Sequence, residues 1–254
     1  MSMEYSQYLK VCDRAAKDSG TFANFRANLA YRTVVESCSR LHGSLYLDWL
    51  QENSPFILHD LDKFVTSDKI GGPFVYQYDG LNIEISPTTL RYIKILVELN
   101  DFFGTLEDKD IIEIGGGYGG QCKIIYDYVK PRSYTLVDLP TALPLAERYL
   151  KQFGIKNVIF KTPDDLFENV YSLCISNYAF SEFDRGFQEL YIDKIISKSS
   201  RGYMLCNCLS RNKGVRLSIL EVLKLKKNGM FVPEDPQTSE GNALYLWGTK
   251  LNIR

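Results

Sequence analysis

The chain has 254 residues, which is enough for one α/β domain with an extension. Hydrophobic residues make up 45% of it, so a large core is expected, and a formal net charge of −1 favours neither nucleic acid nor an anionic membrane as a partner. No apolar run approaches the roughly 20 residues of a membrane span, and the amino terminus lacks the apolar core of a signal peptide. The six cysteines form no CxxC pair, so we expect buried free thiols in a reducing cytoplasm.

Residues 1–72 are predicted to be helical, and we interpret them as an N-terminal extension or lid that precedes the main domain, residues 73–254. Phe22, Phe25 and Leu29 recur at helical spacing and share one face, with Thr21 before them as a candidate N-cap. The only two histidines in the sequence, His42 and His59, have no metal-ligand spacing. The sequence therefore predicts no metal site.

A β-hairpin and a long helix are predicted after Gly71-Gly72-Pro73. The stretch FVYQYDGLNIEIS contains two short alternating runs joined by Asp79-Gly80, a dipeptide typical of hairpin turns. Ser86-Pro87 then fits an N-cap followed by proline at the first helical position. We expect this helix to run to about Phe103.

From Asp110 onward, strands alternate with helices. This alternation predicts an α/β fold with a mainly parallel sheet that is covered on both faces. The predicted strands are Ile111–Ile114, Tyr134–Val137, Asn157–Phe160, Tyr171–Ser176, Gly202–Cys206 and Ala243–Trp247. The main predicted helices are Gln121–Val129, Thr141–Phe153, Ser181–Lys198 and Val215–Lys226, and a short turn follows Asp164.

A glycine-rich turn follows the first of these strands, in the stretch DIIEIGGGYGGQ from Asp110 to Gln121. Glycine tolerates positive φ and has no Cβ, so the backbone can turn sharply and approach a ligand. A strand, a glycine turn and a helix form the layout of a nucleotide-binding crevice at the carboxyl edge of a parallel sheet. The alternative is a turn that only packs the helix on the strand.

The spacing E-x-G-x-G-x-G favours S-adenosylmethionine as the ligand. Glu113 stands two residues before the first glycine, where a carboxylate can hold the cationic methionine end of that cofactor. A dinucleotide fingerprint does not need this acid, and the phosphate-binding pattern GxxxxGK[ST] does not occur in the sequence. The predicted cofactor residues of the turn are Glu113, Gly115, Gly116, Gly117 and Tyr118.

Acidic residues follow the second and third predicted strands. Asp138 is placed to accept hydrogen bonds from two ribose hydroxyls, and the alternative is an acid that begins a turn. Asp164 or Asp165 could accept from the adenine amino group, although Asp165 could equally cap the short helix there.

The fourth predicted strand leads into ISNYAFSEFD, where a substrate would meet the methyl group. We assign Asn177 to the cofactor site. The candidates for a base within reach of a hydroxyl are Glu182, Asp184 and Tyr178, and His59 could fold over from the N-terminal part. Favourable charge placement at a helix amino end explains Glu182 and Asp184 equally well.

Three basic residues, Arg211, Lys213 and Arg216, follow the fifth predicted strand. They could bind the diphosphate of a nucleotide-linked sugar. A solvated basic loop is the alternative.

The motifs EIGGGYGGQ, YTLVDLP, SNYAFSE and RGYMLCN, with SPTTLRY upstream, together resemble the sugar O-methyltransferases, a class I S-adenosylmethionine-dependent family. The resemblance covers roughly residues 73 to 250. It implies a seven-stranded Rossmann-like fold and methylation of a sugar hydroxyl, with S-adenosylhomocysteine as product. It also implies a cytoplasmic role in the synthesis of surface polysaccharides. The resemblance implies no particular catalytic base. We also predict no metal, because a clear acidic triplet for magnesium is absent from the sequence.

Other functions stay open at this stage. The acceptor could be an oxygen or nitrogen of another small metabolite, or the chain could be a non-catalytic binding module that retains the fold. Glu113 and the lack of a tyrosine–lysine pair near the fourth strand argue against a nicotinamide-dependent dehydrogenase. The sequence does not decide whether the chain forms a homo-oligomer.

Overall fold

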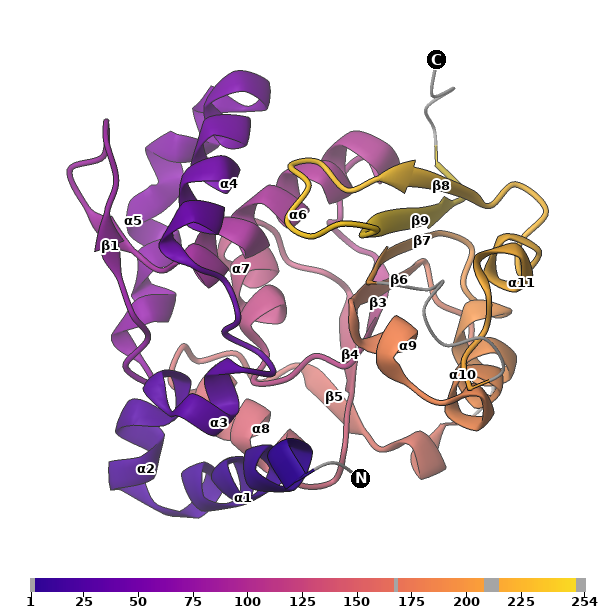
Figure 1. The fold of residues 1–254 in the computed structure, drawn as a ribbon, viewed down its shortest axis with the longest axis horizontal. Coiled ribbons are helices and arrows are strands. Elements are labelled where there is room, and N and C mark those ends of the chain that lie inside the picture. Colours follow the sequence, from indigo (N-terminus) through magenta and orange to yellow (C-terminus); the bar gives the residue numbers. More distant parts are fainter. Residues whose placement is uncertain (1–2, 167–168, 208–214, 250–254) are drawn as a thin grey trace. The chain divides into compact units, whose positions relative to one another are not determined.

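The computed structural model describes residues 3–166, 169–207 and 215–249 (Figure 1). The chain divides into two compact units. The helical unit comprises residues 1–98, 117–128 and 140–156, and the sheet unit comprises 99–116, 129–139 and 157–254. The division that we predicted at residue 72 stays a prediction.

Within the described residues, the sheet unit contains one sheet of seven strands in the order β5-β4-β3-β6-β7-β9-β8. The first five strands along the chain are parallel, whereas β9 lies antiparallel between β7 and β8. The predicted mainly parallel sheet is confirmed. The strands are β3 (Asp110–Ile114), β4 (Ser133–Val137), β5 (Val158–Lys161), β6 (Leu173–Asn177), β7 (Gly202–Cys206), β8 (Met230–Pro233) and β9 (Ala243–Trp247).

Each strand predicted from the sequence is present: β7 and β9 match at both ends, and the other four have ends shifted by one or two residues. Tyr171 was predicted to begin β6, but it forms only an isolated bridge with Ser199. The sequence did not predict β8. This strand is short, partly exposed at the edge of the sheet, and ends in Pro233, so it carries no alternating pattern.

The order of the strands reverses between β3 and β6. From β3 the chain moves outward through β4 to β5, and it then returns to β6 on the other side of β3. The register pairs Ile114 with Ser176, so the carboxyl ends of these two strands lie side by side. In open α/β sheets, ligands bind outside such a reversal point.

The helix predicted over Ser181–Lys198 is broken in the structure. It consists of α9 (Ala179–Glu182), α10 (Arg185–Tyr191) and a π-helical turn, η5 (Ile192–Ile196). Asp184 caps α10 by accepting a hydrogen bond from the Phe187 amide at 3.1 Å. The prediction of one helix was therefore wrong, because the N-cap lies three residues later than Ser181.

The helix predicted over Val215–Lys226 is also shorter than expected. The structure has α11 (Ile219–Leu223), which begins after Ser218. A capping box fixes this start, because Ser218 and Glu221 each bond the backbone amide of the other. A further short helix, η4 (Pro163–Asp165), follows β5.

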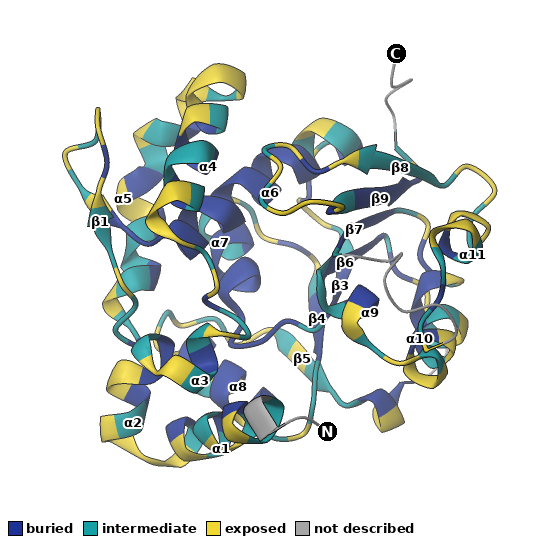
Figure 2. Cartoon of the chain, in the orientation of Figure 1, coloured by how far each residue is buried: buried dark blue, intermediate teal, exposed yellow. Residues whose placement is uncertain are grey.

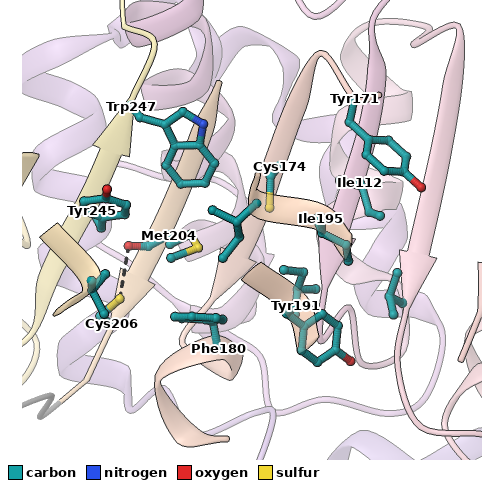
Figure 3. Close-up of a cluster of buried hydrophobic side chains, with 14 of the residues drawn as sticks. Ile112, Tyr171, Cys174, Phe180, Tyr191, Ile195, Met204, Cys206, Tyr245 and Trp247 are labelled. Carbon is teal, nitrogen blue, oxygen red and sulfur yellow. Dashed lines mark hydrogen bonds between the residues drawn. The ribbon is translucent and has the colours of Figure 1, made fainter. Parts of the chain in front are cut away.

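Buried side chains from the strands and from α10 and η5 form the core of the sheet unit (Figure 3). Every residue of β3 from Ile111 to Ile114 is buried, as are those of β7 (Figure 2). Trp247 on β9 packs against the Cα of Gly202 and donates its indole N–H to the Ser199 carbonyl at 3.1 Å. The labelled core residues include Ile112, Tyr171, Cys174, Phe180, Tyr191, Ile195, Met204, Cys206, Tyr245 and Trp247.

The helical unit confirms the helices and the hairpin predicted for its part of the chain. The hairpin pairs Tyr76 with Ile85, although its strands are only two residues long and its turn is wider than Asp79-Gly80 alone. Pro87 begins α6 as predicted. The elements are α1 (Met3–Lys17), α2 (Ser19–Asn24), η1 (Phe25–Ala27), α3 (Leu29–Arg32), α4 (Arg40–Asn53), η2 (Pro55–Asp60), α5 (Leu61–Phe64), η3 (Val65–Lys69), β1 (Tyr76–Gln77), β2 (Glu84–Ile85), α6 (Pro87–Phe103, whose last turn belongs to the sheet unit), α7 (Gly120–Tyr128) and α8 (Leu143–Lys151).

A fully buried arginine, Arg26, connects distant segments of the helical unit. Its Nε donates to Glu36 at 2.5 Å, and its Nη1 donates to the Ser67 carbonyl at 3.0 Å and to Asp68 at 3.2 Å. The guanidinium also lies 4.8 Å from the ring centroid of Tyr118. Two carboxylates and a ring face thus satisfy a charge that could not otherwise be buried.

Across the part of the chain that the structure describes, no helix combines the length and apolarity needed to cross a membrane.

Gly202 tests the packing of the sheet unit. An alanine Cβ at this position would lie 1.9 Å from Trp247, so we expect Gly202→Ala to lower the free energy of unfolding by about 1–3 kcal/mol. Gly186→Ala is the matched control, because only the Asp184 carboxylate lies near, at 3.5 Å, in an exposed helix where alanine is favoured. Urea denaturation of both variants measures the difference, and equal stabilities would contradict the packing.

Candidate functional site

The glycine turn after β3 needs glycine for two physical reasons. Gly115, Gly117 and Gly119 have φ values of 72°, 56° and 86°, which side chains rarely adopt. At Gly115 an added Cβ would also lie 2.2 Å from the Cβ of Ala179, which follows β6. The two strand ends at the reversal point are therefore in van der Waals contact through a position that only glycine can fill.

Glu113 lies directly beneath this turn. Glu113 is 2% exposed, and its carboxylate accepts a hydrogen bond from the Tyr134 hydroxyl at 2.7 Å. A Cβ on Gly116 would meet Leu136 at 2.5 Å and the Glu113 carboxylate at 3.1 Å. Burial raises the pKa of Glu113 to about 7, and the negative charge of Asp138 adds to this rise.

Asp138 immediately follows β4, the strand beside β3. Its side chain is half-buried, and one carboxylate oxygen accepts the Leu139 amide at 2.7 Å. Because Ile114 pairs with Val137, Asp138 follows the carboxyl end of β4 beside the end of β3, and its negative charge helps to raise the pKa of Glu113. The structure thus brings together Glu113, Asp138 and the first glycines of the turn.

The two adjacent acids after β5 differ in their surroundings. Asp165 accepts hydrogen bonds from the Thr162 hydroxyl at 2.6 Å and from its amide, and the Thr162 hydroxyl lowers the pKa of Asp165. This carboxylate closes the turn of η4, as one of our two interpretations expected. Asp164 is exposed and accepts no hydrogen bond from the described residues, so its carboxylate is the one available to a ligand. The adenine contact itself stays a prediction.

Asn177, the last residue of β6, has an amide group without a hydrogen-bond partner in the described chain. Both its side-chain nitrogen and its oxygen are buried. A buried amide that bonds to nothing is costly, so this group fits a site in which a polar ligand completes its hydrogen bonds. It is next to the reversal point, as the predicted cofactor role requires.

The candidate bases of the sheet unit follow β6 closely. Glu182 is exposed and accepts a hydrogen bond from the Asn207 amide at 2.7 Å. Asp184 caps α10, which is the alternative that its position suggested. Tyr178 has a left-handed backbone and donates its hydroxyl hydrogen bond to Glu234. Their catalytic roles stay predictions.

His59 and Tyr118 belong to the helical unit. His59 is exposed in η2, where its ring lies 6.4 Å from that of Phe56. Tyr118 is fully buried among Phe25 and Tyr149, so its side chain is part of an aromatic core. Any contact of Tyr118 with a cofactor would therefore come from its backbone.

Two of the three predicted phosphate-binding residues, Arg211 and Lys213, lie outside the described residues. Arg216 is described and half-buried. The phosphate contact stays a prediction for all three.

The sequence did not identify Tyr134 or Glu234 as functional residues, and Asn207 entered only as the last residue of the motif RGYMLCN. Glu234 stands in a loop of mixed polar residues, and nothing in its spacing links it to Tyr178. Tyr134 faces Glu113 only because β3 and β4 pair in register. Among the described residues, no group of three or more His, Cys, Asp or Glu side chains could hold a metal ion.

No protein-family model matches the sequence, and no curated protein matches it either. Solved structures align with parts of this chain. A Thermoplasma acidophilum protein is 15% identical over 74% of this chain and 95% of its own, with a TM-score of 0.45. A provisionally assigned methyltransferase from Streptococcus mutans, solved with S-adenosylhomocysteine, is 16% identical over 60% and 95%, with a TM-score of 0.46. The N-methyltransferase NodS from Bradyrhizobium japonicum is 13% identical over 61% and 92%, also with a TM-score of 0.46.

The strand order confirms the predicted seven-stranded Rossmann-like sheet. When β3 is counted as strand 1, the order of this sheet is 3-2-1-4-5-7-6, whereas a dinucleotide-binding sheet has the order 3-2-1-4-5-6. The difference is the antiparallel β9, which is inserted between β7 and the edge strand β8. At identities of 16% or less, the three alignments leave the function to be inferred from the residues of the site.

The buried carboxyl group of Glu113 makes stability depend on pH. Its folded-state pKa of about 7 lies above the usual 4.5, so between these values the folded protein retains a proton that the unfolded chain releases. This contribution to stability is complete below about pH 4.5 and is lost as the pH rises through 7. Relative to Glu113→Gln, the wild-type unfolding free energy should fall by at most about 3 kcal/mol over this interval.

Urea denaturation at several pH values between 4.5 and 8 measures this difference. Glu107→Gln removes an exposed carboxyl group of the same unit and should follow the wild-type curve. Parallel curves for wild type and Glu113→Gln would show that folding does not raise the pKa of Glu113.

Proposed function

We propose that this protein is an enzyme that transfers the methyl group of S-adenosylmethionine to a hydroxyl group of a sugar. The observation that carries the proposal is the convergence of polar groups at the reversal point of the sheet. There the buried carboxyl of Glu113, the orphaned amide of Asn177 and the carboxylate of Asp138 flank a turn that brings the backbone close to a ligand.

The residues at this edge fit the chemistry of the proposed cofactor. Glu113 would hold the cationic methionine end, because a positive charge compensates a carboxylate that burial otherwise keeps protonated. Asp138 would accept the two ribose hydroxyls, and Asp164 would accept the adenine amino group. When bound, S-adenosylmethionine supplies a methyl group on a positively charged sulfur.

The sugar acceptor rests on the resemblance of four sequence motifs, and the fold supports methyl transfer in general. We propose a nucleotide-activated sugar, used in the cytoplasm for surface polysaccharides, with Arg211, Lys213 and Arg216 on its diphosphate. The enzyme's task is then to align the hydroxyl behind the methyl–sulfur bond and to accept its proton, and alignment can supply several kcal/mol of the barrier.

Calorimetry with S-adenosylhomocysteine and, separately, NAD tests the cofactor. We expect binding of the first alone. Asp138→Ala should weaken it by about 1–3 kcal/mol, on the order of 5- to 150-fold in Kd, because two ribose hydroxyls lose their acceptor. Asp193→Ala removes an exposed carboxylate of the same unit and should leave Kd unchanged. Binding of NAD instead, or of neither compound, would refute the methyltransferase.

A panel of nucleotide sugars tests the acceptor, with transfer of the labelled methyl group as the readout. Replacing Arg211, Lys213 and Arg216 by glutamine together should raise KM for the sugar that turns over, since the diphosphate loses its charge partners. The Kd for S-adenosylhomocysteine should not change. Equal KM values for wild type and triple variant would remove the phosphate role while leaving the methyl transfer intact.

A further inference from the structure

Tyr178 has an unusual backbone conformation at the carboxyl end of β6. Its φ of 70° and ψ of −25° lie in the left-handed region. Among the described residues other than glycine, only Asp108 shares a positive φ. Such conformations persist where the surrounding structure enforces them, and they concentrate at functional sites. Glycine would relieve the strain, so a tyrosine here indicates a use for its side chain.

Several hydrogen bonds enforce this conformation. The Tyr178 amide donates to the Leu205 carbonyl on the neighbouring β7 at 2.9 Å. Its carbonyl accepts the Ser181 hydroxyl at 2.7 Å, and the same hydroxyl oxygen accepts the Asn207 amide at 3.1 Å. The backbone of Tyr178 is therefore fixed from the next strand and from α9 together.

The side chain of Tyr178 is fixed as well. Its hydroxyl donates a hydrogen bond to Oε1 of Glu234, a residue that is 4% exposed. The other carboxylate oxygen, Oε2, accepts the Thr238 amide at 3.0 Å, the Thr238 hydroxyl at 2.8 Å and the Asn242 amide group at 2.9 Å. Three donors thus hold the carboxylate in one orientation, with Oε1 directed at the phenol.

The topology of the sheet places this pair at the ligand-binding edge. Because β9 is antiparallel, its first residue, Ala243, pairs with Cys206 at the carboxyl end of β7 and with Pro233 at the end of β8. The loop 234–242 therefore lies at the same edge as the end of β6. Ala179, next to Tyr178, contacts Gly115 of the glycine turn.

We propose that Tyr178 and Glu234 form the proton relay of methyl transfer, an inference that rests on the proposed function. The acceptor hydroxyl donates its hydrogen bond to the phenol oxygen of Tyr178. As the acceptor oxygen bonds to the methyl carbon, the carbon–sulfur electron pair stays on sulfur and leaves a neutral thioether. The hydroxyl proton passes to Tyr178, whose own proton passes to Oε1 of Glu234. The sulfonium and carboxylate charges are lost together, so the step balances.

The relay does not use the two acids that follow Tyr178, Glu182 and Asp184, because each has another contact. Asp184 is occupied as the cap of α10, and Glu182 is exposed and bonded to Asn207. Tyr178 is then the catalytic residue, and Glu234 is the positioning residue that orients it and receives the proton.

Four variants test the relay: Tyr178→Phe, Glu234→Gln, Glu234→Asp and, as a control in the same loop, the exposed Glu240→Gln. Turnover is followed against pH with the nucleotide sugar that the wild type methylates fastest. Unfolding midpoints and the Kd of S-adenosylhomocysteine are measured for each protein. We expect Tyr178→Phe and Glu234→Gln to lower kcat about 100-fold or more, with KM and Kd within about threefold of wild type. Glu234→Asp should regain part of kcat, and Glu240→Gln should match the wild type.

Glu234→Gln should also flatten the acid limb of the kcat profile, which a purely structural role would not change. A kcat for Tyr178→Phe within threefold of wild type overturns the relay. The relay is also overturned if kcat falls equally in Glu234→Gln and Glu234→Asp and the unfolding midpoint falls with it, because a loss of stability then explains the loss of turnover. In either case unchanged binding of S-adenosylhomocysteine leaves the methyltransferase standing, whereas loss of binding in the wild type refutes the methyltransferase itself.

An NMR experiment decides the placement even if no sugar in the panel turns over. In protein labelled with 3-fluorotyrosine, the Tyr178 resonance is assigned by its loss in Tyr178→Phe. Saturating S-adenosylhomocysteine should shift this resonance, and Glu234→Gln should shift it in the free protein. A resonance that responds to neither contradicts the relay.

Discussion

The site depends on one constraint, a carboxyl group buried in the central strand of the sheet. The described residues offer Glu113 a hydrogen bond from Tyr134 but no ion pair. A carboxyl group in that position is neutral for much of the pH range unless a cation arrives. The glycine at position 116 lies against the same group, because a Cβ there would lie 2.5 Å from Leu136 and 3.1 Å from the Glu113 carboxylate. The turn that admits a ligand and the group that needs one are thus parts of a single arrangement.

Local patterns were sufficient to predict most of the sheet. Runs such as Ile111-Ile112 mark buried parallel strands, since both faces are covered and the residues need not alternate. The glycine spacing and Asp138 likewise led us to predict a ligand site at the carboxyl ends of the strands. Helix ends were less predictable, because Ser181 and Asp184 are both good caps and tertiary packing decided between them.

The pair of Tyr178 and Glu234 could not be predicted in the same way. The two residues are 56 positions apart, and they meet only because β9 runs antiparallel between β7 and β8. No pattern in the sequence indicated β8, so the loop after it had no expected place. A left-handed tyrosine is also invisible in composition, as its conformation results from hydrogen bonds to Leu205 and Ser181. A side-chain pair that depends on long-range strand pairing therefore cannot be predicted from local patterns in a single sequence.

The buried Arg26 has a consequence for how this protein can change over evolutionary time. It joins residues 36, 67 and 68 to the ring of Tyr118, which follows the glycine turn directly. A recombination event with a breakpoint between residues 26 and 68 would separate the guanidinium from one or both of its carboxylates and leave unpaired charge in the interior. Residues 26–68 are thus expected to be inherited as one block, with substitutions at Arg26, Glu36 and Asp68 occurring in concert.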